Sequence, residues 1–177
     1  KSLVLLRLNR NRFNGFSSDI GHLESLEELD LRFNLITHQI PKKISMLKKI
    51  VKVKLGGNMM SGEIVDFSPL RDTLRLLDLS SNMLTGEIPY SLSECTNLRV
   101  ISLNSNSLTG GVPDYLRYLS DLNVLRVEHN CLTKKVGKKL CKKVEDWNTD
   151  FRSDCLGEIK CECCSTCYNS SGDCSVN

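Results

Sequence analysis

The chain has 177 residues, of which 40% are hydrophobic and 25% are charged, and its formal net charge is +3 at pH 7. This composition is typical of a folded protein with a hydrophobic core, and the charge is too small and too balanced for a nucleic-acid-binding surface. The sequence contains no run of about 20 apolar residues, which excludes a membrane-spanning helix within it.

A repeat of 24 residues governs the sequence. Five asparagines follow one another at this spacing, and a sixth, Asn11, precedes the first of them by 23 residues. The five are Asn34, Asn58, Asn82, Asn106 and Asn130. Around each lies the pattern LxxLxLxxNxLxGxIP, whose clearest copy occupies residues 74–97. A period of this length, kept this strictly, indicates a solenoid of stacked repeats.

The six repeats begin at residues 3, 26, 50, 74, 98 and 122, and several depart from the pattern. The first lacks the IP pair, and the second has His38 where glycine is expected. The third has IV instead of IP, and its Phe67 and Leu70 predict a shifted outer loop. The sixth loses glycine and proline after Leu132 and becomes basic. Because the chain starts inside a repeat, we expect a fragment whose signal segment and N-terminal cap lie upstream.

Each repeat combines a short strand with a sharp turn. The alternation of leucines, such as Leu77 and Leu79, has a period of two, so these side chains point into the coil from a β-strand. The strands of neighbouring repeats are expected to form one parallel sheet. The asparagine offers one acceptor and two donor hydrogens to backbone groups that the turn leaves unpaired. Loss of the asparagine would cost about 1–3 kcal/mol for each backbone group left without a hydrogen-bond partner.

Between residue 3 and about residue 140 the sequence resembles the plant-type leucine-rich repeat family, whose signature is LxxLxxLxLxxNxLxGxIPxxLxxLxx. Receptor-like kinase ectodomains and polygalacturonase inhibitors share this repeat. The resemblance implies a right-handed α/β solenoid with the parallel β-sheet on its concave face. It divides the chain into six repeats (residues 1–133) and a disulfide-rich C-terminal cap (residues 134–177).

The cap is predicted to open with a short amphipathic helix. Val136, Leu140, Val144 and Trp147 recur at helical spacing and can lay one apolar side over the sixth repeat. The lysines between them would then face water, although they could also form a basic patch for an acidic partner. These lysines are Lys138, Lys139, Lys142 and Lys143.

Eight of the nine cysteines lie in the last 47 residues: Cys131, Cys141, Cys155, Cys161, Cys163, Cys164, Cys167 and Cys174. An even number packed this densely predicts disulfides and an oxidising compartment. A zinc site is the alternative, because Cys164 and Cys167 have ligand spacing, but no second CxxC or nearby histidine completes it. The adjacent Cys163 and Cys164 should have different partners.

Two further features bear on localisation, and a third concerns the one cysteine within the repeats. The cysteine order resembles the C-terminal region of leucine-rich repeat proteins from diatoms and related algae, which implies an extracellular protein. Asn169 lies in the one N-x-[ST] glycosylation acceptor of the sequence, and it fits an exposed secreted tail. Cys95 stands alone in the repeats and is predicted to be a free thiol in the core.

A ligand is expected on the concave face, on side chains that the repeat pattern leaves free. Adjacent strands lie about 4.8 Å apart, so equivalent residues form ladders across the sheet. Self-pairing of opposite charges is the competing interpretation of these ladders, and for Phe33 it is packing on a neighbour rather than a binding anchor. The candidate ligand-binding residues are Arg7, Arg10, Asp30, Arg32, Phe33, Lys54, Asp78, Asn104, Arg126, Glu128 and His129.

No catalytic constellation is apparent, and neither a cofactor nor a metal is expected. The three histidines fall in separate repeats, and no hydrolase, metalloprotease or phosphate-loop motif is present. We therefore expect an extracellular recognition module for a protein, peptide or glycan, without nucleic-acid partners and with any membrane anchor outside these residues. The alternatives are a structural surface for a wall, adhesion or ice, and an inhibitor of a secreted hydrolase. A uniform row of small polar residues would favour the structural role.

Overall fold

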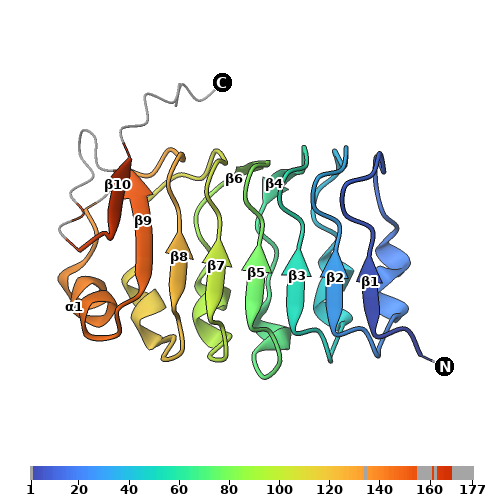
Figure 1. Ribbon diagram of the computed structural model, residues 1–177, viewed down its shortest axis with the longest axis horizontal. Coiled ribbons are helices and arrows are strands. Elements are labelled where there is room, and N and C mark those ends of the chain that lie inside the picture. Colours follow the sequence, from blue (N-terminus) through green and yellow to red (C-terminus); the bar gives the residue numbers. More distant parts are fainter. Residues whose placement is uncertain (1, 134, 155–160, 162, 169–177) are drawn as a thin grey trace.

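The computed structural model describes residues 2–133, 135–154, 161 and 163–168. One parallel sheet runs the length of the molecule with its strands side by side, from β1 at the N-terminal end to β10 (Figure 1). These strands are β1 (Leu5–Arg7), β2 (Glu28–Asp30), β3 (Lys52–Lys54), β5 (Leu76–Asp78), β7 (Val100–Ser102), β8 (Val124–Arg126), β9 (Asp150–Asp154) and β10 (Thr166–Tyr168). The predicted solenoid with its parallel sheet is confirmed.

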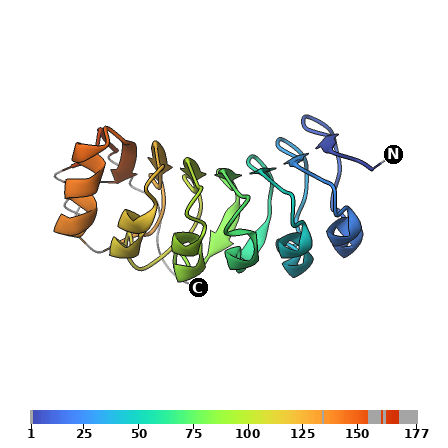
Figure 2. The ribbon, with the colours of Figure 1, turned by 90° about the horizontal axis from the view of Figure 1, so that it is seen from below.

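The sheet lines the concave side of a curved molecule, and short helical turns cover the convex side (Figure 2). Five of these are 3-10 helices: η1 (Ser18–His22), η2 (Lys42–Met46), η3 (Ser68–Leu70), η4 (Tyr90–Glu94) and η5 (Asp114–Tyr118). The helix η3 is shorter than the other four, and the residue before it, Phe67, is fully buried. The outer loop of the third repeat, which the sequence predicts to be shifted, is therefore the one whose 3-10 helix differs from the others.

A second, two-stranded sheet forms where the chain leaves the concave face. Its strands are β4 (Ser61–Glu63) and β6 (Met83–Thr85), which are paired in parallel. Their register is staggered, so that Glu63 lies beside Thr85, and Glu87 forms a similar bridge to Thr109. A carboxylate side chain therefore lies beside a hydroxyl side chain once in this sheet and once at the bridge next to it.

The core is a continuous stack of the predicted leucines and isoleucines. The concave strands pair in register, so Val53 lies next to Leu77 and Leu77 next to Ile101, and all three are fully buried. Leu3 and Phe13, in the first repeat, are nearly half exposed because no repeat packs on their outer side in this structure. Each repeat therefore buries its apolar side mainly against its neighbours.

The asparagine of each inner repeat joins three segments of backbone. Asn58 Nδ2 donates to the carbonyl oxygens of Leu31 (3.0 Å) and Leu55 (2.8 Å), and its Oδ1 accepts from the Ile36 amide (3.2 Å). Asn82, Asn106 and Asn130 repeat this arrangement one turn further along. The prediction that the asparagine forms hydrogen bonds with backbone groups of the turn is confirmed. Some of these hydrogen bonds also join one repeat to the repeat before it.

The helix α1 (Lys138–Asp146) begins the cap, as predicted, and buries Leu140 and Val144. The expectation for Trp147 was wrong, because its side chain is 51% exposed. The helix has ended at this point, and the ring instead receives the Lys143 ammonium 3.5 Å from its centroid.

The chain then returns to the sheet, which the repeat pattern did not predict. Strand β9 pairs with β8 and buries Phe151 in line with Leu125, and β10 pairs with β9. The carboxylate of Asp154 accepts from the backbone amides of His129 and Asn130 at 2.9 and 3.0 Å. A carboxylate thus takes the place of the backbone carbonyl that a further repeat would supply.

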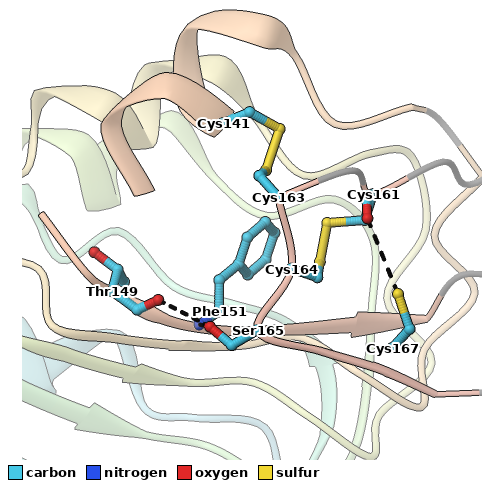
Figure 3. Close-up of a disulfide and its surroundings, with 8 residues drawn as sticks. All are labelled: Cys141, Thr149, Phe151, Cys161, Cys163, Cys164, Ser165 and Cys167. Carbon is cyan, nitrogen blue, oxygen red and sulfur yellow. Dashed lines mark hydrogen bonds between the residues drawn. A yellow bond between two sulfur atoms is a disulfide. The ribbon is translucent and has the colours of Figure 1, made fainter. Parts of the chain in front are cut away.

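Disulfides tie the cap together beside Phe151 (Figure 3). Cys141 of α1 is bonded to Cys163, and Cys161 is bonded to Cys164, so the two adjacent cysteines have different partners as predicted. Cys131 and Cys167 are disulfide-bonded as well. This bonding excludes the zinc alternative at Cys164. Cys155, Cys174 and Asn169 lie outside the described residues.

Candidate recognition surface on the concave face

The predicted ladder of concave side chains exists as drawn from the sequence. The pairing register places Arg7 opposite Asp30, Asp30 opposite Lys54, and Lys54 opposite Asp78. The same row continues through Ser102 and Arg126, and then reaches Arg152 of the unexpected strand β9. The partners of these charges differ from the simple pairing of neighbours in the row.

Glu28, one row away, is the hub of the charges at the N-terminal end. Its carboxylate accepts two hydrogen bonds from Arg7 (2.8 and 3.1 Å) and one from Lys54 (2.7 Å). Lys52 lies 4.0 Å from the same carboxylate. Hydrogen bonds from Arg7 and Lys54 lower the pKa of Glu28 to about 2, so it is ionised at all physiological pH values.

Asp30 is paired with a residue just beyond the end of its own strand rather than across the sheet. Arg32 donates to both of its oxygens, from Nε at 3.0 Å and from Nη2 at 2.7 Å. Burial alone would raise the pKa of Asp30, but the Arg32 guanidinium holds it below its usual range. Opposite charges on this face therefore pair with one another, as the self-pairing interpretation held. The pairs do not, however, join neighbours in the row of Arg7, Asp30 and Lys54.

Phe33 is held in a conformation that costs free energy. It adopts a left-handed backbone (φ 55°), which bulky residues rarely do, yet its side chain is 53% exposed. The ring lies against Gly57, where an added Cβ would come within 2.6 Å of it, and the Arg10 guanidinium lies 5.6 Å from its centroid. Half of an aromatic ring therefore faces solvent at a strained site.

The middle of the concave face is apolar with polar flanks. Leu76, Val100 and Val124 stand opposite one another in register and are half-buried. Asp78, on the adjacent row, accepts hydrogen bonds from the amide and the hydroxyl of Ser80 at 3.1 and 2.6 Å. Asn104 is half-buried one strand further along.

The C-terminal end of the face carries paired charges and one buried acid. Arg126 Nη2 lies 3.4 Å from Asp150, which also receives two bonds from Arg152 at 3.1 Å. His129 remains exposed, and its ring meets the ring of Tyr168 edge-on, with centroids 5.1 Å apart. Glu128 is 5% exposed, and one of its carboxylate oxygens has no hydrogen-bond partner among the residues that the structure describes.

Burial raises the pKa of Glu128, and this has a measurable consequence. Because the folded-state pKa lies above that of the unfolded chain, folding favours the protonated carboxyl. That contribution is fully present below about pH 4 and is lost as the pH rises through the folded value. Glu128→Gln, which stays uncharged, should therefore be more stable than wild type at pH 7 and equal to it at pH 4. Urea unfolding at both values measures this, and a variant that is less stable at pH 7 would contradict it.

Four charged residues of this surface were not identified from the sequence. Glu28 and Lys52 are the first residues of their strands. The candidate residues named from the sequence lie at the end of each strand or in the turn after it, so these two are not among them. Asp150 and Arg152 lie on β9, in a stretch without leucines. The alternation in DFRSD, with Phe151 and Ser153 inward, is the signal that could have identified this strand.

The described residues have three further features that bear on function. Within residues 2–133, 135–154, 161 and 163–168 no three His, Cys, Asp or Glu residues are grouped to hold a metal ion. In the same ranges no helix has the length and apolar character needed to cross a membrane. A cavity of about 740 Å³ lies on the outer side, between Gln39 and Lys42 of one repeat and Glu63 and Asp66 of the next.

The sequence and the structure are both similar to those of known proteins. The model of the Leucine Rich Repeat family matches residues 25–47, 73–95 and 97–119. No curated protein sequence matches the chain significantly. The ectodomain of the receptor kinase GASSHO1/SCHENGEN3 from Arabidopsis thaliana, solved with CASPARIAN STRIP INTEGRITY FACTOR 2, is 31% identical over 80% of this chain, with a TM-score of 0.75.

Two further solved structures resemble the chain. The Arabidopsis receptor kinase HAESA, in complex with the peptide hormone IDA and a co-receptor, is 30% identical over 86% of this chain (TM-score 0.77). A plant ice-binding protein is 33% identical over 78% of it (TM-score 0.69). The chain spans only 17% of the GASSHO1/SCHENGEN3 chain, 26% of the HAESA chain and 43% of the ice-binding chain.

Proposed function

Because this chain is a leucine-rich repeat protein of the plant type, we propose that it is a non-catalytic recognition module that binds a protein or peptide on its concave face. Phe33 carries the proposal. A bulky side chain at a left-handed position costs about 1–3 kcal/mol, and a ring that remains half exposed regains little of this by burial. Binding hot spots are rich in aromatic residues with arginine beside them, as Arg10 is here.

Two other observations support this function. The receptor kinase HAESA, which has this fold, has been solved with the peptide hormone IDA, although the chain spans only a part of it. The disulfides of the cap favour an oxidising compartment, and so an extracellular module. An inhibitor of a secreted hydrolase would be a special case of such a module.

The structural alternative, an ice-facing or wall-facing surface, receives less support. Such a surface needs a uniform row of small uncharged groups. On the outer sheet the stagger sets Glu63 beside Thr85 and Glu87 beside Thr109, and on the concave face charged residues occupy most of the central row. The likeness to the ice-binding protein therefore supports only the fold for this chain.

The Phe33→Asn variant separates a binding anchor from a packing residue. Asparagine tolerates the left-handed region, so we expect unchanged or higher stability together with a loss of affinity of about 30-fold, the size of a hot spot. Unfolding by urea and binding to partners captured from secreted proteins and peptides are the two measurements.

Tyr118→Asn is the matched control. Tyr118 is 55% exposed and has the Arg117 guanidinium 4.3 Å from its ring centroid, but it ends η5 on the convex side. We expect this variant to keep every partner. If Phe33→Asn lowers stability and leaves the same partners bound, Phe33 serves packing and the concave assignment is wrong.

A further inference from the structure

The first three strands of the concave face and their turns form a positively charged cluster. Four cationic side chains lie against two carboxylates there, those of Glu28 and Asp30, which are 4% and 3% exposed, and a fifth, Arg10, lies over the ring of Phe33. The cations, which we call the positive cluster, are Arg7, Arg10, Arg32, Lys52 and Lys54. Both acids are buried beneath the cations, so the surface presented to a partner is positive.

Three of the five cations of this cluster are held by hydrogen bonds before any partner arrives. Arg7 and Arg32 each make two hydrogen bonds to a buried carboxylate, and Lys54 makes one. The outer parts of the two arginine side chains remain accessible, with 56% of the Arg7 side chain and 33% of the Arg32 side chain exposed, whereas the Lys54 side chain is 17% exposed. The buried acids therefore remove much of the entropy that long side chains lose on binding.

The charge of the face changes along the solenoid. Beyond β3 the central row reaches Asp78, whose carboxylate is bonded to Ser80, and the half-buried Leu76 and Val100 lie beside it. At the far end Arg126 and Arg152 share Asp150, and burial favours the neutral form of Glu128. Two arginines and one carboxylate leave less excess positive charge there than the five cations and two carboxylates of the positive cluster, so the excess is largest at the end near the first repeats, next to Phe33.

We propose that the partner of the concave face is an acidic polypeptide segment, with carboxylates over the positive cluster and an apolar side chain on Phe33. This inference rests on the proposed function and adds the chemistry of the partner and the end of the face that its acids occupy. A polypeptide fits better than an acidic polysaccharide because an exposed ring and an apolar row, with Leu76 and Val100, adjoin the charges. A polypeptide can carry acidic and apolar groups side by side.

The test is selection of displayed random 12-residue peptides on the intact chain. We expect the enriched peptides to combine Asp or Glu with an aromatic or aliphatic residue. Their binding should weaken about tenfold between 50 and 500 mM NaCl, because exposed charges are screened over this range. Polygalacturonate is tested as a competing polyanion and should bind more weakly than the selected peptides.

The Lys52→Gln variant tests whether the selected peptides bind at the positive cluster. Lys52 is 47% exposed and lies 4.0 Å from Glu28, which keeps its bonds to Arg7 and Lys54 when Lys52 is neutralised. We expect a selected peptide to bind this variant about fivefold more weakly, as for loss of one steering charge. Lys42→Gln makes the same change of net charge on η2, on the convex side, and should alter binding less than twofold.

The outcomes separate this inference from the proposed function. Enriched peptides without acidic residues, or equal effects of Lys52→Gln and Lys42→Gln, would overturn the acidic partner while leaving concave recognition standing. Tighter binding of polygalacturonate than of any peptide would replace the polypeptide with a polysaccharide. If no peptide is enriched and Phe33→Asn changes no partner, both the inference and the proposed function fail.

Discussion

Replacing Asn58 with alanine is expected to lower the free energy of unfolding by about 3 kcal/mol. The side chain is 8% exposed and satisfies two carbonyl oxygens and one amide, from Leu31, Leu55 and Ile36. Alanine would leave these groups in the core without partners, at about 1 kcal/mol or more for each. Urea unfolding followed by far-ultraviolet circular dichroism measures the loss.

Asn11→Ala is the control for this prediction, because it makes the same substitution at the same position of the repeat. Asn11 is exposed and donates only to the carbonyl oxygens of Leu8 and Asn9, which water can satisfy instead. We expect a loss below about 1 kcal/mol. Equal losses for the two variants would mean that burial of the asparagine ladder contributes nothing to stability.

Joint replacement of Cys141 and Cys163 by serine is expected to cost about 3 kcal/mol. The bond between them closes a segment with a sequence separation of 22, and removing it restores freedom to the unfolded chain. It also releases α1 from the segment that leads to β10, so the cap should be the first part to open. Hydrogen exchange of the β8 and β9 amides, compared with that of β3, would show where protection is lost.

Cys95→Ala is the comparison for the disulfide variant. Cys95 is a free thiol in the core, and burial raises its pKa to about 12, so it should resist alkylation in the folded state. We expect a smaller loss, of about 1 kcal/mol, spread over the repeats rather than focused on the cap. If the double serine variant is as stable as wild type, the bond does not hold the cap.

The repeated part of the fold could be predicted from the sequence because one pattern dictates one local structure. Asn58 and Leu77 each have equivalents 24 residues away, so a single interpretation places them all in register. The end of the solenoid could not be predicted in this way. There Phe151 replaces leucine and Asp154 replaces a backbone carbonyl, and these exchanges are visible only once the neighbouring strand is known.

The candidate site was predictable in position but not in its pairing. The register correctly placed Arg7, Asp30 and Lys54 in one row. The distance between Arg7 and Glu28 depends on side-chain length and direction, which strand spacing does not specify. The exposure of Trp147 could not be predicted either. Its position in the sequence fits the helical spacing of the apolar residues, but the helix ends at the residue before it.

The left-handed turn residue bears on how such a chain can change over evolutionary time. Each repeat has one residue with positive φ immediately before its asparagine, and Arg10, Phe33, Gly57, Ser81, Ser105 and His129 hold these places. The backbone there is fixed by the asparagine bonds, so five residue types occupy the same geometry. Mutation at these six places can therefore alter what the protein recognises one repeat at a time, at a cost in stability set by how well the new residue tolerates positive φ.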